Sequence, residues 1–301
     1  MEEVQHRTRS LFEMAKEKIE DITEEEKNEP FVASPGWWDK YSKRMGLGSV
    51  KLIGEAASAD HEAAEKFPET LKKVIEEEGY SEDQIYNADE CGLWWKMAPT
   101  RTIKLKTRQS PGLKLQKARS TILLGGNASG NHKLKPFFIH TSLKPHCFRN
   151  VKDLKTLPVI WAANKKAWMK AALFEKWFTE NFIPEVQADC RRKNIPFKIL
   201  LLLDNCTAHP DLSHINPNVK TMMLPPNTTS LIQPMDQGCI ATAKAIYKKL
   251  TFQKAHETHE TLADFLKDYD VLQAVKTFGR AWHQITKKNM RAVWNPLLKV
   301  N

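Results

Sequence analysis

Residues 197–205 read Phe-Lys-Ile-Leu-Leu-Leu-Leu-Asp-Asn, a run of apolar residues that ends in an acidic and an amide side chain. A continuous apolar run of this length, closed by turn-forming residues, predicts a strand that is buried on both faces of its sheet. Ligands of such sheets bind beyond the carboxyl ends of the strands. The stretch therefore predicts a sheet covered by helices on both sides, with Asp204 at its functional edge.

The segments on either side of this strand alternate between strand and helix patterns. Further strands are expected where short apolar runs are separated by turn residues, at residues 84–96, 101–107, 120–127, 135–141 and 219–224. Helices are expected at residues 168–193, 236–254 and 270–285, the first with Trp168 on its apolar face. This order predicts an α/β fold, a mixed sheet flanked by helices.

The same patterns divide the chain into four segments. Residues 1–60 are expected to form a small helical unit, in which a helix at 37–45 starts after a Ser-Pro-Gly sequence and ends at Gly46. Residues 61–80 are expected to form a connecting helix, residues 81–255 the core, and residues 256–301 a C-terminal helical segment.

The composition narrows the class of protein. The 301 residues are 41% hydrophobic and 27% charged, which excludes a disordered chain. A formal net charge of +10 favours a polyanionic partner, and nucleic acid is the commonest one. Five scattered cysteines give neither a disulfide framework nor zinc-site spacing. The N-terminus lacks a secretory signal and the longest apolar run is too short to span a bilayer, so we expect a soluble, intracellular protein with no membrane partner.

Three aspartates occupy the positions where such a sheet would present a site. Asp89 lies in an expected strand, Asp204 ends the most buried strand, and Asp236 starts an expected helix. Phosphodiester cleavage by two metal ions needs carboxylates that hold the ions roughly 3.5–4 Å apart, and Mg²⁺ or Mn²⁺ prefers such oxygen ligands. The alternative stays open from spacing alone, because an aspartate after a strand or before a helix commonly forms a turn or caps the helix.

Four ordered segments carry a resemblance to a known family. They are Asn-Ala-Asp-Glu-Cys-Gly-Leu at 87–93, Lys-Ala-Arg-Ser-Thr-Ile-Leu-Leu at 117–124, Leu-Asp-Asn-Cys-Thr-Ala-His-Pro at 203–210 and Leu-Pro-Pro-Asn-Thr-Thr-Ser-Leu-Ile-Gln-Pro-Met-Asp-Gln-Gly at 224–238. Their order and sequence are similar to those of pogo/Tigger-type transposases in the Tc1/mariner superfamily, and specifically to the Tigger, Jerky and centromere protein B group. Cys91 departs from the family pattern, in which Thr or Ser is usual at this position.

The resemblance implies an RNase H-like fold and a DDE endonuclease site. In that site Asp89, Asp204 and Asp236 are both the catalytic residues and the ligands of a two-metal site that holds Mg²⁺ or Mn²⁺. It further implies a nuclear protein that binds DNA and cuts and joins its strands, and a homodimer is compatible with it. The alternative is a domesticated, catalytically silent nuclear protein that binds DNA or chromatin, and the sequence leaves open whether the enzyme is active.

The N-terminal unit adds a second resemblance. Residues 34–46 and 54–60 resemble the second helix-turn-helix of the centromere protein B-type DNA-binding region, and the chain starts too late to contain the first one. We expect DNA phosphates to be contacted by the basic side chains of this unit, Lys40, Lys43, Arg44 and Lys51. An ordinary solvated helix face would carry the same residues.

Residues near the three acids leave roles undecided. His209 either contacts a phosphate or water near the metals or merely precedes Pro210 at a chain turn. Glu90 should point to the face opposite Asp89, because side chains alternate along a strand, and is therefore not expected to be a ligand. A DNA track or a charged hairpin would equally explain the basic run of Lys104, Lys106, Arg108, Lys114, Lys117 and Arg119.

Overall fold

A computed structural model describes residues 35–45, 59–97 and 118–298, and the chain divides into two compact units, Met1–Leu52 and Ile53–Asn301. The described part of the first unit is the helix α2 (Pro35–Arg44). Its rings of Trp37 and Tyr41 are stacked with centroids 4.9 Å apart, as neighbours one helical turn apart can be. Apart from residues 59–60, the remainder of the expected helix-turn-helix lies outside the described residues.

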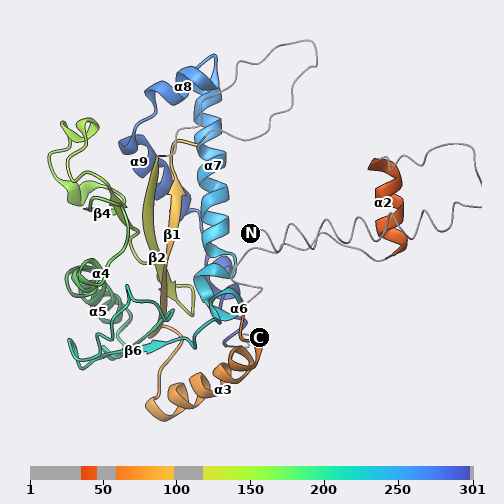
Figure 1. Ribbon diagram of the computed structural model, residues 1–301. Coiled ribbons are helices and arrows are strands. Elements are labelled where there is room, and N and C mark those ends of the chain that lie inside the picture. The colour runs from red at the N-terminus through yellow and green to blue at the C-terminus, as the bar shows by residue number, and fades with distance from the viewer. Residues whose placement is uncertain (1–34, 46–58, 98–117, 299–301) are drawn as a thin grey trace, which may run out of the picture. The chain divides into compact units, whose positions relative to one another are not determined.

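The second unit is built on one six-stranded sheet (Figure 1). Its strands are β1 (Ile85–Trp94), β2 (Arg119–Asn127), β3 (Phe137–His140), β4 (Ile160–Ala163), β5 (Ile199–Leu203) and β6 (Val219–Met223), in the spatial order β4-β3-β2-β1-β5-β6. The strands β1, β2 and β3 form an antiparallel meander, β4 adds parallel to β3, β5 adds parallel to β1, and β6 to β5. This arrangement is the RNase H-like sheet, so the predicted fold class is confirmed.

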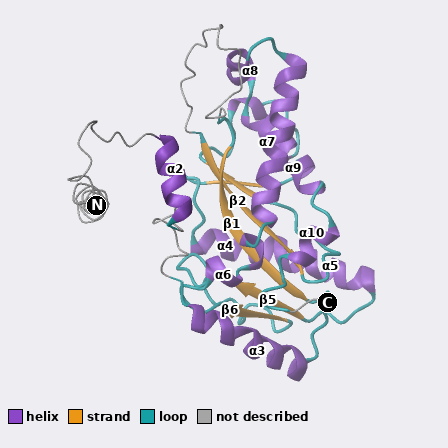
Figure 2. Ribbon diagram, turned by 90° about the vertical axis from the view of Figure 1, so that its right-hand side faces the viewer, coloured by secondary structure: helices purple, strands orange, loops and turns teal. Residues whose placement is uncertain are grey.

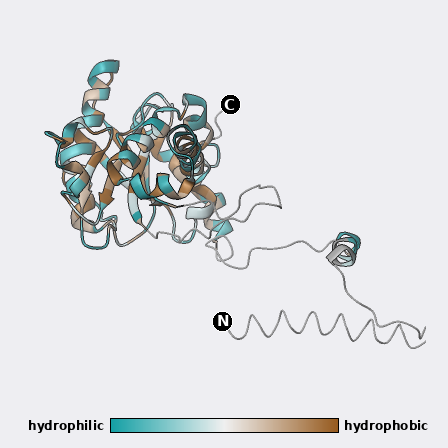
Figure 3. Cartoon of the chain, turned by 90° about the horizontal axis from the view of Figure 1, so that it is seen from above, coloured by the Kyte–Doolittle hydropathy of each residue, from teal (hydrophilic) through white to brown (hydrophobic). Residues whose placement is uncertain are grey.

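Helices cover both faces of the sheet. They are α3 (His61–Glu78), α4 (Ala171–Trp177), α5 (Ile183–Lys193), α6 (Thr229–Ile232), α7 (Cys239–Thr258), α8 (Leu262–Asp268), α9 (Val271–His283) and α10 (Lys287–Ala292). Figure 1 shows α4 and α5 on one side of the sheet, and Figure 2 shows α7 beside β1 and β2 on the other. Apolar residues therefore lie between three layers, and Figure 3 shows them inside a body with hydrophilic outer segments.

Alternation along the central strands divides the core into two clusters. In β5, Leu200 and Leu202 pack with residues of α7 and α9, whereas Leu201 and Leu203 pack with residues of α4 and α5. Every residue of β5 is fully buried, as its continuous apolar sequence predicts. The two faces of the sheet are thus both covered, which leaves the strand ends as the places where polar side chains can reach solvent.

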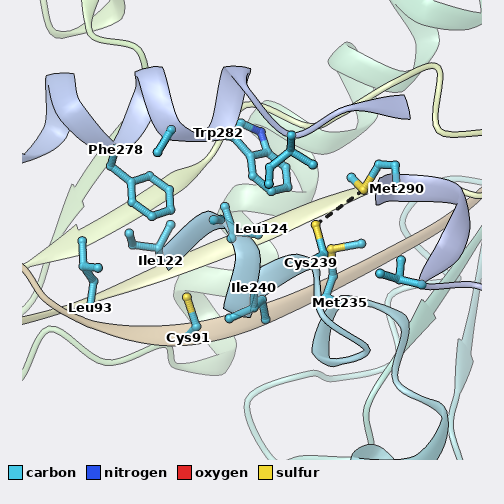
Figure 4. Packing of buried hydrophobic residues seen from close by; sticks show 14 of the residues in the cluster. Cys91, Leu93, Ile122, Leu124, Met235, Cys239, Ile240, Phe278, Trp282 and Met290 are labelled. Carbon is cyan, nitrogen blue, oxygen red and sulfur yellow. Dashed lines mark hydrogen bonds between the residues drawn. The ribbon is translucent and has the colours of Figure 1, made fainter. Parts of the chain in front are cut away.

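On the α7 side, the core contains the cysteine that departs from the family pattern (Figure 4). Cys91 and Leu93 of β1 lie in the same cluster as Ile240 of α7 and Phe278 of α9. Burial raises the pKa of the Cys91 thiol to about 12, so the residue is a packed thiol and not a thiolate nucleophile. A thiol at residue 91, in place of the hydroxyl of the usual Thr or Ser, suits this apolar surrounding.

Several expected elements end differently in the structure. The long helix expected at 168–193 starts only at Ala171 and contains a π-helical turn, Phe178–Phe182, between α4 and α5. The prediction that Trp168 lies on the apolar face of that helix is wrong, because the residue precedes the helix and is 53% exposed. The helix expected from residue 236 starts at Cys239, because Gly238 has a φ of 111° that no helix residue adopts.

The remaining boundaries follow local signals. The helix α3 begins after Asp60, whose side chain accepts a hydrogen bond of 2.9 Å from Ala63 N, and ends at Gly79 with a left-handed φ of 70°. The short strand β4 and the helices α8 and α10 are not predicted individually by the sequence patterns. The strand expected at 101–107 lies outside the described residues. In the described part of the chain no helix is long and apolar enough to span a bilayer.

We expect Leu202→Ala to lower the free energy of unfolding by about 2–5 kcal/mol, because it leaves a cavity between β5 and α7 in a fully buried region. Leu143→Ala, at a position that is 53% exposed, serves as the control and should change it by less than about 0.5 kcal/mol. Urea denaturation followed by far-ultraviolet circular dichroism measures both. Equal effects of the two substitutions would contradict the assignment of β5 to the centre of the core.

Candidate active site

Two of the predicted acids lie at matching levels on neighbouring strands. The parallel register pairs Ile85 with Leu200 and Asn87 with Leu202, and the same register continued by two residues brings Asp89 level with Asp204. Ile85 and Leu200 face the same core cluster, so Asp89 and Asp204 follow on that face by the alternation of strand residues. The sheet therefore presents both carboxylates side by side at the end of β5.

A buried amide clamp brings the third acid to the same place. The side chain of Asn87 is fully buried, and its Nδ2 donates to Leu202 O at 3.0 Å and to Gln233 Oε1 at 2.8 Å. Its Oδ1 accepts from Met235 N at 3.0 Å. Gln233, also fully buried, donates from Nε2 to Ala88 O at 3.4 Å. These bonds tie the segment just before Asp236 to β1 and β5.

Asp236 itself ends a short 3-10 helix, Pro234–Asp236, and is exposed. The alternative that Asp236 caps the following helix is wrong, because the cap residue of α7 is Gly238. The residue is instead held between the buried Met235 and the turn that leads into α7. Its carboxylate is close enough to the first acid for its charge to act on the ionisation of Asp89.

Asp89 has an environment that disfavours its charged form. It is 7% exposed, and its carboxylate accepts one hydrogen bond in the described structure, from Glu90 N at 2.7 Å. Burial raises the pKa of the Asp89 carboxyl well above its usual value, and the charges of Asp236, Glu90 and Asp204 raise it further. No described lysine, arginine or histidine forms an ion pair with Asp89. The three predicted acids thus share one electrostatic neighbourhood.

This donor set fits a hard divalent cation. Carboxylate oxygens are the ligands that Mg²⁺ and Mn²⁺ prefer, and a bound cation would reverse the sign of the field that opposes ionisation of Asp89. In the described part of the chain, the carboxylate oxygens of the three acids do not all lie within 4.8 Å of one another. Repulsion between carboxylates favours such a separation when no metal is bound. The arrangement therefore has the composition of a metal site in which Asp89 has no cationic partner among the described residues.

His209 joins two acids on the other side of this edge. The imidazole is 4% exposed; its Nε2 lies 3.0 Å from both carboxylate oxygens of Glu90, and its Nδ1 lies 2.5 Å from Asp204 Oδ1. The contact between Nδ1 and Asp204 Oδ1 is an ion pair when the imidazole is protonated. Its ring packs against Phe174 of α4 at 4.4 Å between centroids.

The charge on His209 decides what this cluster can do. Burial lowers the pKa of the imidazole, but the contacts with Asp204, Cys206 and Glu90 outweigh that effect and raise the pKa to about 12. Asp204, Cys206 and His209 place ligand atoms within 4.8 Å, yet an imidazolium has no lone pair to offer a metal. With the imidazole protonated, the cluster is an ion pair that holds Asp204, and only a deprotonated His209 could serve as a metal ligand there.

The outcome for Glu90 is twofold. Asp89 points to the α7 side, and Glu90 reaches His209, which packs on the α4 side, so the expected alternation is correct. No sequence pattern indicates the contact between Glu90 and His209, because the two residues are 119 positions apart. Of the expected DNA-contacting residues, Lys40, Lys43 and Arg44 are exposed on α2, and Lys51 lies outside the described residues.

We expect Asn87→Ala to lower the free energy of unfolding by about 2–5 kcal/mol, because it leaves Met235 N and Gln233 Oε1 buried without partners and opens a cavity. Asn218→Ala, on an exposed turn, is the matched control and should have an effect below about 0.5 kcal/mol. Urea denaturation at neutral pH measures both. An Asn87→Ala chain as stable as the wild type would show that the hydrogen bonds of Asn87 do not contribute to the free energy of unfolding.

Comparisons with known proteins agree with the motifs. A family model described as DDE superfamily endonuclease matches residues 117–294. The human Tigger transposable element-derived protein 7 is 33% identical over 287 residues, which cover 89% of this chain and 52% of that protein. The human Jerky protein homolog is 33% identical over 292 residues, which cover 95% of this chain and 49% of that protein. The chain spans about half the length of these curated relatives.

A solved chain of the Mos1 strand transfer complex aligns with a TM-score of 0.44 and 12% identity, over 87% of this chain and 66% of that one. This likeness is too weak to assign a fold, and the RNase H-like fold follows from the strand order β4-β3-β2-β1-β5-β6. The family match spans β2 to α10, includes Asp204 and Asp236, and takes in more than half of the chain. It shows that the chain belongs to the DDE superfamily endonuclease family, and the four sequence motifs are similar to those of Tc1/mariner-type transposases.

Proposed function

We propose that the core of this chain is a metal-dependent DNA endonuclease that cleaves DNA strands and transfers their ends. One observation supports this most strongly: Asp89 is a buried carboxylate that has acids around it and no described cation paired with it. A protein rarely keeps such a group without a ligand that compensates it. The names of the relatives, which describe transposable element-derived proteins, support DNA as the substrate.

In this proposal each residue has a distinct task. Asp89, Asp204 and Asp236 hold Mg²⁺ or Mn²⁺ in a two-metal site. The bound ions would activate the attacking oxygen and neutralise charge on the leaving oxygen of the phosphodiester. Asn87 and Gln233 position Asp236 relative to the sheet, and Glu90 with His209 orients Asp204 from behind. Neither of these supporting groups needs to touch the DNA.

The wider assignments belong to the same proposal. We propose that residues 1–60 form a DNA-binding unit of the centromere protein B type, with Lys40, Lys43, Arg44 and Lys51 on DNA phosphates. Residues 61–80 would connect it to an endonuclease core at 81–255, followed by a helical segment at 256–301. A protein that acts on chromosomal DNA would work in the nucleus. The formal charge of +10 supports a nucleic acid partner.

We expect Mn²⁺ to stabilise the folded chain, because the ion binds the acid cluster only when β1, β5 and the segment before α7 are assembled. At a concentration 100 times the dissociation constant the gain is about 2.7 kcal/mol, visible as a higher melting temperature. Asp89→Asn should abolish most of this gain while it raises the stability of the metal-free chain, since it removes a buried carboxyl whose ionisation the surrounding acids and burial oppose. Differential scanning calorimetry with and without Mn²⁺ separates the two effects.

The stability of the Asp89→Asn chain without Mn²⁺ tests the inference about the carboxylates most directly. If Asp89→Asn lowered the free energy of unfolding of the metal-free chain, the inference that the carboxylates around Asp89 destabilise the fold would be wrong. Asp268→Asn, at a side chain that is 72% exposed and pairs with His259 at the surface, is the control; it should change the metal-free stability by less than about 1 kcal/mol and leave the gain from Mn²⁺ unchanged.

The catalytic part of the proposal is tested by cleavage of a plasmid that carries the matching transposon ends. With Mg²⁺ or Mn²⁺ present, we expect strand cleavage by the wild-type chain and a loss of about 100-fold or more for Asp204→Asn or Asp236→Asn, since bound metal supplies several kcal/mol of transition-state stabilisation. Asp268→Asn should cleave like the wild type. Gel electrophoresis of the plasmid measures nicked and linear products.

The alternative function predicts another pattern in the same assay. A domesticated, silent protein would bind Mn²⁺ and DNA, would cut neither strand, and would keep its DNA affinity in the Asp204→Asn chain. That combination of results would reject the endonuclease proposal and leave the DNA-binding one. Cleavage that is unaffected by substitution of the acids would reject the assignment of the site itself.

A further inference from the structure

The loop between β4 and α4 carries an exposed tryptophan, and hydrogen bonds within the loop fix its backbone conformation. Trp168 is 53% exposed, although large aromatic side chains are usually covered. Asn164 fixes the loop: its Nδ2 donates to Trp168 O at 2.6 Å, and its Oδ1 accepts from Lys166 N and Trp168 N at 3.2 Å each. Ala167 is buried with a left-handed φ of 52°, which costs energy for a residue with a Cβ.

Cations flank this indole. Arg119 Cζ lies 6.0 Å and Lys166 Nζ 5.7 Å from the ring centroid, near the outer limit of a cation–π contact, so both charges stay available to a further partner. Lys165 and Lys170 are exposed on the same loop. The sequence from residue 154 to residue 174 contains no aspartate or glutamate. We refer to Trp168, Arg119 and Lys166 as the tryptophan platform.

The tryptophan platform is joined to the strand that carries the first acid. Arg119 starts β2 opposite Trp94, and its guanidinium lies over Gly92 of β1, where an added Cβ would meet Arg119 Nε at 2.6 Å. Gly92 faces the same side of β1 as Glu90, two residues or about 7 Å away along the strand. The absence of a side chain at Gly92 therefore lets the Arg119 guanidinium lie over β1 and near Trp168, on the face of β1 opposite to Asp89.

We propose that the tryptophan platform binds an unpaired nucleotide of DNA, with the base on the Trp168 ring and the flanking phosphate between Arg119 and Lys166. This inference rests on the proposed function for its substrate, and it adds that DNA is held with at least one base out of the duplex. An aromatic ring accepts any base, and an adjacent arginine and lysine neutralise the phosphate.

A protein partner fits the platform less well. Protein-binding patches are depleted in lysine and bury a contiguous apolar core, whereas Trp168 stands among exposed lysines on a loop without acids. A blunt duplex would reach the cations, but its stacked bases would leave the indole in water. The combination of one exposed indole with several cations favours a partner that supplies both a flat apolar face and negative charge, which is what an unpaired nucleotide does.

The test compares binding of a fluorescein-labelled single-stranded oligonucleotide with that of the blunt duplex of the same sequence. Fluorescence anisotropy is measured in EDTA, on the full chain, so that no cleavage is required. We expect Trp168→Ala to weaken binding of the single strand by about 5- to 150-fold, the range for loss of one stacked base, and to change duplex binding by less than about twofold. Trp168→Phe should retain most of the affinity.

Two further variants control the result. Leu143→Ala removes another apolar side chain that is 53% exposed and should leave both affinities unchanged. Gly92→Ala should displace the flexible end of Arg119 and weaken binding of the single strand while the fold is kept, because the three atoms nearest to the added Cβ all belong to that side chain. Circular dichroism checks that each variant is folded.

Several outcomes would overturn the inference. They are single-strand binding by Trp168→Ala equal to that of the wild type, an equal loss for single strand and duplex, and a wild-type chain that does not bind the single strand. A change in self-association by sedimentation without a change in DNA binding would assign the platform to contacts between copies. Repeating the binding in the Asp204→Asn chain separates this inference from the endonuclease proposal, because stacking on Trp168 needs no metal.

Discussion

The buried amide of Asn87 is the constraint on which the site depends. One side chain donates to β5 and to Gln233 and accepts from the backbone that precedes Asp236, so three segments far apart in sequence meet at one residue. A buried amide with every polar atom satisfied is rigid, since any displacement leaves a donor or acceptor without a partner. The clamp places the acids without being an acid itself.

What the clamp assembles is electrostatically unfavourable. Bringing Asp236 and Asp204 near the buried Asp89 disfavours ionisation of Asp89, and the fold has to supply the energy that holds the carboxylates there. Part of the charge is offset by His209, which lies between Asp204 and Glu90. The imidazolium thus compensates Asp204 and Glu90, whereas the buried Asp89 has no cationic partner among the described residues.

Sequence patterns predict the parts of this picture that are local. The apolar run of β5 predicts burial on both faces, and alternation in β1 predicts that Asp89 and Glu90 point apart, because both depend on neighbours along one strand. The pairing of Glu90 with His209 depends on contacts across the fold and leaves no local trace. The error at Trp168 has a related cause: its spacing suits a helix, but the loop that Asn164 holds delays the helix start to Ala171.

The alternation of β1 also separates two demands that a nuclease site makes on one strand. A metal ligand needs a rigid, water-poor setting, and Asp89 has it on the face covered by α7. Contact with a long polyanion needs exposed cations, and the opposite face supplies one where Gly92 makes room for Arg119. Because Arg119 and Asp89 lie on opposite faces of β1, substitution of Arg119 would change the proposed contact with DNA while Asp89 stays in place.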